Sequence, residues 1–71
     1  MKPDEIRKLE TYLRNTFKSP GISVRPRPRK DDSCEVYVAD EFLGVIFRDD
    51  EDEDLCWNFQ MAILEIDVED L

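Results

Sequence analysis

The stretch Leu55-Cys56-Trp57-Asn58-Phe59-Gln60-Met61-Ala62-Ile63 decides how this chain folds. Large apolar side chains occupy every second position, with small or polar residues between them. A period of two is typical of a strand that buries one face, whereas a helix would scatter the same residues around its circumference. We therefore predict a long strand over 55–63, and the rest of the chain must supply the surface that covers it.

A helix is predicted over residues 3–18. Pro3 suits the first helical position, where a missing N–H costs nothing, and Lys18 favours the opposite end. Ser19-Pro20-Gly21 then stops the helix. Between these ends, apolar side chains recur at spacings of three, four and four, and form one stripe: Ile6, Leu9, Leu13 and Phe17.

Alternating sequences predict three more strands before the acidic run at 49–54. Pro26 and Pro28 cannot donate ladder hydrogen bonds, so the first of these strands should lie at a sheet edge. We expect a polar connection over 27–33 between the first strand and the second. The three strands cover residues 22–26, 34–38 and 42–47.

A two-residue loop at Asp40-Glu41 would pair Val38 with Leu43 on the core face. The same register pairs Tyr37 with Gly44 on the second face, where an aromatic ring can cover a glycine. Six side chains would then share the core face: Cys34, Val36, Val38, Leu43, Val45 and Phe47. Three large side chains would lie on the second face: Tyr37, Phe42 and Ile46.

The number of residues between the last two strands decides which face Trp57 occupies. An odd number places Trp57 and Phe59 on the face of Val36, and an even number places them on the opposite face. We expect the odd number, because the core needs that apolar surface. After Ile63 the apolar phase changes, so residues 64–68 either bulge and continue the strand or form a short turn.

These elements predict an α+β fold in one domain over 1–71. One N-terminal helix packs on one face of a four-stranded antiparallel meander sheet, in the order α-β-β-β-β. A single helix covers only one face of a sheet. The second face is then either a contact surface or covered by the end of the chain, with Val68 and Leu71 included.

The composition argues against an enzyme. The chain of 71 residues has no His, only two Gly and only two Cys, Cys34 and Cys56, which lack zinc-ligand spacing. It has no glycine-rich phosphate loop, and a domain this small has little room for a pocket. We therefore expect no catalytic residue and no cofactor.

The basic segment Arg25-Pro26-Arg27-Pro28-Arg29-Lys30 is the strongest signal for RNA or single-stranded DNA binding. Residues 1–30 carry nine Lys or Arg against three acids, a balance of +6, whereas residues 31–71 carry one base against fifteen acids, a balance of −14. The acidic part would repel a phosphate backbone. The alternative is that the basic residues meet acids of this chain or of a neighbour. The candidate contacts are Arg25, Arg27, Arg29 and Lys30.

The acidic run Asp49-Asp50-Glu51-Asp52-Glu53-Asp54 offers oxygen ligands to a hard divalent cation. It does not follow the EF-hand loop, because the sixth position from Asp50 is Leu55 instead of Gly. The alternative to a weak metal site is a solvated loop. The candidate ligands are Asp49, Asp50, Asp52 and Asp54.

No run approaches the roughly 20 apolar residues of a membrane span, and the charged N-terminus lacks the apolar core of a signal peptide. We expect a cytoplasmic protein with no membrane association.

The chain carries four motifs that are informative in combination: residues 1–10 (MKPDEIRKLE), 25–30 (RPRPRK), 41–45 (EFLGV) and 58–64 (NFQMAIL). Together they resemble a family of small alphaproteobacterial proteins, domain of unknown function 3126. The resemblance spans nearly the whole chain and implies a free-standing bacterial cytoplasmic protein. It implies no activity, ligand or catalytic residue.

The function expected from these features is a non-catalytic module for protein–protein contact. The partner is either an unidentified protein or a second copy of the chain. The second sheet face is the predicted contact surface, with Tyr37, Phe42 and Ile46 as the partner-binding residues.

Overall fold

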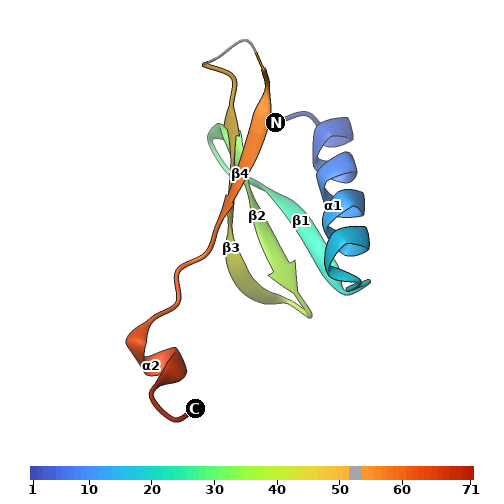
Figure 1. Cartoon of the computed structure of the whole chain (residues 1–71). Coiled ribbons are helices and arrows are strands. Elements are labelled where there is room, and N and C mark those ends of the chain that lie inside the picture. The colour runs from blue at the N-terminus through green and yellow to red at the C-terminus, as the bar shows by residue number, and fades with distance from the viewer. Residues whose placement is uncertain (52–53) are drawn as a thin grey trace.

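A computed structural model describes residues 1–51 and 54–71. The four strands form one antiparallel sheet in the order β1-β2-β3-β4, and α1 packs mainly against β1 (Figure 1). The predicted α+β fold, one helix followed by a four-stranded antiparallel meander, is confirmed. The elements are α1 (Pro3–Phe17), β1 (Ile22–Arg27), β2 (Lys30–Val38), β3 (Glu41–Asp49), β4 (Cys56–Gln60) and α2 (Glu65–Val68).

Helix α1 ends one residue earlier than predicted. Lys18 follows it in the left-handed region, with φ 53°, and its N–H donates to the carbonyl of Arg14. Such a residue satisfies a free carbonyl at the end of a helix, a role that glycine fills most often.

Strand β1 lies at the sheet edge, as its prolines predicted. Its outward backbone groups are covered by α1: the N–H of Val24 donates to Glu10 Oε2 at 2.9 Å, and Arg14 Nε donates to the carbonyl of Ile22 at 2.7 Å. A covered edge cannot pair with another strand. The helix therefore closes one edge of the sheet as well as packing on its face.

The predicted polar connection over 27–33 is wrong. Pro28-Arg29 forms a tight turn, and β2 already begins at Lys30, which pairs with Arg27. Proline pre-sets the backbone for the first turn position, and Arg29 takes the positive φ of 62° that the second position requires. The charged residues after the turn are thus part of the strand.

The predicted β2–β3 register is also wrong. The turn is Ala39-Asp40, with φ 48° and 66°, as a type I′ hairpin requires. A bulge at Leu43 then brings Gly44 opposite Val36. The bulge turns Ile46 toward the core and Val45 and Phe47 toward the second face, whereas the turn shifts the pairing by two residues and changes no face.

The connection between β3 and β4 has an even number of residues, so the expected odd number is wrong. Asp49 pairs with Cys56, which leaves the six residues 50–55 between the strands. Phe59 lies opposite Ile46. The β2–β3 register also differs from the prediction, and the two differences cancel. Phe59 and Trp57 therefore lie on the same face as Val36, where the core needs their apolar surface.

Strand β4 is shorter than the predicted strand over 55–63. It ends at Gln60, and residues 61–71 leave the sheet as an arm that holds α2 and points away from the body (Figure 1). Of the two alternatives for residues 64–68, the short turn is the one observed. No helix in the described ranges is long and apolar enough to cross a bilayer.

The core lies between α1 and the β1–β2 half of the sheet. Its partly buried neighbours include Leu9, Val38, Leu43 and Phe59. The buried hydrophobic residues are Ile6, Leu13, Ile22, Val24, Cys34, Val36 and Ile46.

Candidate functional site

Helix α1 lies over the β1 side of the sheet and leaves the β3–β4 side of the same face open. A groove of about 560 Å³ lies between α1 and β4. Its lining is mostly apolar, with Glu5 and Lys8 as the charged residues. The lining residues are Glu5, Lys8, Leu9, Tyr12, Leu13, Ile46, Leu55, Cys56, Trp57 and Phe59.

A second hollow of about 280 Å³ shares Leu13 and Phe59 with the first and lies toward the end of α1. Its lining includes Phe17, Leu43 and Met61. We call the two together the α1–β4 groove. It runs along α1 from Glu5 to Phe17.

Glu5 ties one end of the groove together. Its carboxylate accepts a hydrogen bond from Trp57 Nε1 at 2.7 Å and lies 3.6 Å from Arg48 Nε. These contacts hold β3 and β4 against the start of α1 and orient the indole ring. The sequence signalled Glu5 only as an acid in the first turn of the helix.

The strand that decided the fold is less buried than its pattern predicted. Trp57 is 37% exposed, Leu55 42% and Met61 49%. These side chains form a wall of the groove because no second helix covers them in the described chain. The period of two identified the strand correctly, but it did not show how much of the face α1 covers.

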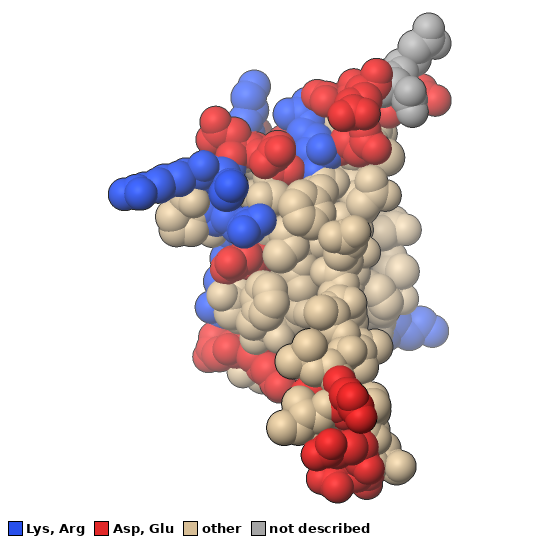
Figure 2. Space-filling view, turned by 90° about the vertical axis from the view of Figure 1, so that its left-hand side faces the viewer, with Lys and Arg blue, Asp and Glu red and all other residues tan. Residues whose placement is uncertain are grey.

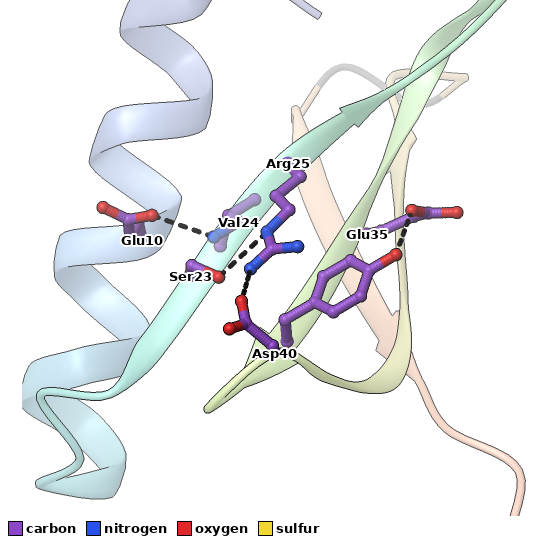
Figure 3. Close-up of polar contacts among 7 residues, drawn as sticks. Glu10, Ser23, Val24, Arg25, Glu35 and Asp40 are labelled. Atoms are coloured by element: carbon purple, nitrogen blue, oxygen red, sulfur yellow. Dashed lines mark hydrogen bonds and ion pairs between the residues drawn. The ribbon is translucent and has the colours of Figure 1, made fainter.

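The second sheet face holds Tyr37 and Phe42 together, as expected. Their rings meet edge to face, with centroids 5.7 Å apart and planes at 73°. Arg25 lies 4.0 Å from the Tyr37 ring centre and pairs with Asp40 at 2.7 Å (Figure 3). The third predicted member of this surface, Ile46, is wrongly placed, because it lies on the core face and is 2% exposed.

The Tyr37 hydroxyl donates to Glu35 Oε1 at 2.9 Å (Figure 3). This hydrogen bond to the carboxylate, with some burial, raises the pKa of Tyr37. Figure 2 views the molecule from the side away from α1, where uncharged residues cover the middle, acidic residues lie at the upper and lower ends, and basic residues lie at the upper left. The second face is thus a small aromatic patch within a polar network.

The four candidate nucleic-acid contacts differ in whether they have partners within the chain. Arg25 is paired with Asp40, and Arg27 Nη1 donates to Ser33 Oγ at 3.0 Å. Arg29 and Lys30 are exposed at the hairpin turn. Two of the four side chains are therefore already engaged within the chain.

Of the candidate metal ligands, Asp52 lies outside the described residues. Asp49 ends β3, and Asp50 and Asp54 are exposed. Within residues 1–51 and 54–71, no three acidic, Cys or His side chains are grouped so that they could hold a metal ion.

Both cysteines are free. Cys34 is fully buried, and burial raises the pKa of its thiol to about 11. A thiol with this pKa is protonated at neutral pH and is a poor nucleophile. Cys56 is exposed and lines the groove.

Residues 5–67 match the sequence model of a family described as "Protein of unknown function (DUF3126)". The chain belongs to this family. The DUF3126 match includes all four strands and most of the arm, and it confirms the resemblance to this domain of unknown function. No curated protein and no solved structure matches the chain.

Proposed function

We propose that this DUF3126 protein is a non-catalytic protein–protein interaction module that binds its partner through the α1–β4 groove. The observation that carries this proposal is the groove itself, an apolar hollow next to the core with Trp57 and Tyr12 still exposed on its walls. Contiguous exposed apolar surface of this kind marks interaction sites in soluble proteins.

The chemistry of the groove supports binding over catalysis. Among the described residues, Glu5 is the one acid that lines the groove, and it is already engaged by Trp57 and Arg48. Lys8 is the one base in that described lining. A surface with large aromatic side chains and few charges resembles the centre of a protein interface. The partner segment it fits is apolar.

The setting we propose is the bacterial cytoplasm. The aromatic patch of Tyr37 and Phe42 on the second face is a smaller contact surface in this proposal. Arg25 and Glu35 hold its Tyr37 ring, which leaves Phe42 as its more exposed ring.

Site-specific photo-crosslinking in living bacterial cells tests the proposed function. A photoreactive phenylalanine analogue at Tyr12 reports on the groove. The same residue at Thr11 is the matched control, because neighbouring helix positions point about 100° apart. We expect a discrete crosslinked protein band from position 12 and none from position 11. Equal labelling at both positions, or none from position 12, would contradict the proposal.

A further inference from the structure

The arm over residues 61–71 exposes a set of large apolar side chains between its acids. Its hydrogen bonds in the described structure are internal, such as the Asp67 N–H to the Leu64 carbonyl at 2.9 Å and the Leu64 N–H to Asp67 Oδ2 at 3.0 Å. An ordered segment with this much exposed apolar surface lacks the surface that would bury it. Its large apolar side chains are Ile63 (67% exposed), Leu64 (59%), Ile66 (70%), Val68 (46%) and Leu71 (100%).

The arm leaves the molecule at the end of its own groove. Met61 lines the groove next to Phe17, and the backbone is still extended at Leu64, with φ −83° and ψ 153°. Residues 61–71 contain no Gly or Pro, the residues that most often reverse a chain. The arm therefore points away from the groove of its own subunit (Figure 1).

We propose that the arm of one subunit docks in the α1–β4 groove of a second copy, and that the arm of the second copy docks in the groove of the first. This inference rests on the proposed function and names the partner of the groove. Each chain carries both the apolar arm and the apolar groove. In a dimer of two copies related by a two-fold axis, both arms and both grooves would be buried at once.

The charges of the two surfaces are complementary. Residues 61–71 carry four acids and no base, whereas residues 1–18 carry five Lys or Arg against three acids. Lys8 lies on the groove itself. Opposite charges at the rim of an apolar contact favour one partner over others and speed association. A neutral or basic peptide would lack this match.

The size of the exchanged surface fits a stable dimer. Each subunit would contribute ten arm residues, 62–71, and the ten residues that line the main hollow of the groove. That total of twenty is within the usual range of about 20–30 residues per side.

The test combines one arm variant with one groove variant of the full chain. Ile66→Asp places a charge on the arm, and Tyr12→Asp places one on the groove. Both side chains are mostly exposed, so neither change removes core packing. We expect sedimentation equilibrium to show a dimer for the natural chain. Each variant should raise the dimer dissociation constant roughly 100-fold, because the substitution removes one apolar side chain from each of the two equivalent contacts.

Mixing the two variants gives the decisive result. A heterodimer of Ile66→Asp with Tyr12→Asp holds one intact arm in one intact groove, whereas neither homodimer holds any. We therefore expect the mixture to form dimers at concentrations where each variant alone is monomeric. Thr11→Asp is the control, and it should dimerise like the natural chain.

Three results would overturn arm exchange: a natural chain that is monomeric at all concentrations, a dimer that Ile66→Asp leaves unchanged, or a mixture that stays monomeric. The first result, together with a crosslink from Tyr12 to a different protein, would still support the proposed function. Absence of any crosslinked protein would remove the proposed function as well.

Discussion

Gly44 is a residue where β3 and the end of β4 approach closely. A Cβ built at this position would lie 2.2 Å from the Gln60 carbonyl oxygen and 2.9 Å from Met61 Cβ. A backbone atom at that distance must move if a side chain is added. Only glycine therefore fits at position 44, where the end of β4 lies against β3 and the chain continues into the arm.

We predict that Gly44→Ala lowers the free energy of unfolding by about 2 kcal/mol, because overpacking against backbone costs roughly 1–3 kcal/mol. Urea unfolding measures this change. Gly21→Ala is the matched control, since a Cβ there meets nothing within 4 Å and the glycine has no positive φ. A Gly44→Ala protein as stable as the Gly21→Ala protein would contradict the observed crossing.

Because the Cys34 thiol is buried, we predict that the free energy of unfolding falls at alkaline pH. Burial raises the pKa of this thiol from its ordinary value of 9.0 to about 11. Between these values the folded chain keeps the proton while the unfolded chain releases it. The contribution of the thiol to the free energy of unfolding is therefore complete below pH 9, and it falls by roughly 2–3 kcal/mol as pH rises to about 11.

Urea unfolding at pH 8 and pH 10.5 measures this contribution. Cys34→Ala removes the titrating group, so we expect its stability to fall less between the two pH values. An equal fall in both proteins would show that the Cys34 thiol does not cause it.

At the scale of elements, the contact between α1 and β1 depends on two side chains. Glu10 and Arg14 bond the outward N–H of Val24 and the carbonyl of Ile22, and they pair with each other at 3.3 Å. They stabilise the helix–sheet contact and block the sheet edge against another strand.

We predict that Glu10→Ala destabilises the fold by about 1–2 kcal/mol, because it leaves a backbone donor without its acceptor. It should also raise the tendency to aggregate, which light scattering during thermal unfolding measures. Glu10→Gln keeps an acceptor oxygen and should lose less stability. Equal losses in both variants would show that the charge, rather than the edge hydrogen bond, matters.

The β2–β3 turn supplies the other prediction at this scale. Ala39 adopts φ 48°, a region that Asn tolerates better than Ala. Ala39→Asn should therefore raise the free energy of unfolding by about 0.5–1 kcal/mol, measured by urea unfolding. An unchanged or lower stability would contradict the left-handed turn at Ala39.

The sequence predicted the elements better than their registers. Apolar periodicity identified α1 and β4 because side-chain spacing follows backbone geometry directly. The turn at Ala39-Asp40 was missed because Ala is not typical of positive φ, and the bulge at Leu43 leaves no mark in an alternating pattern. The bulge moved Ile46 from the predicted contact surface into the core, and the turn placed Phe42 rather than Gly44 opposite Tyr37.

At the scale of the whole molecule, one helix covers only part of one sheet face. That partial cover produces the α1–β4 groove and leaves Trp57 on its wall. The sequence indicated that one helix would leave apolar surface free, but it assigned that surface to the second face and did not predict the groove beside α1. Which part of a sheet a helix covers depends on the docking contacts of Glu10 and Arg14, and these contacts follow from no local pattern.

Trp57 fluorescence tests the central claim most directly, because the chain has one Trp and its ring lies on the groove wall at 37% exposure. If a second copy's arm fills the groove, the emission maximum should shift to shorter wavelength as concentration rises from about 1 μM to about 1 mM. In the Ile66→Asp variant it should stay constant. A natural chain with constant emission over this range, or an equal shift in both proteins, would contradict the account.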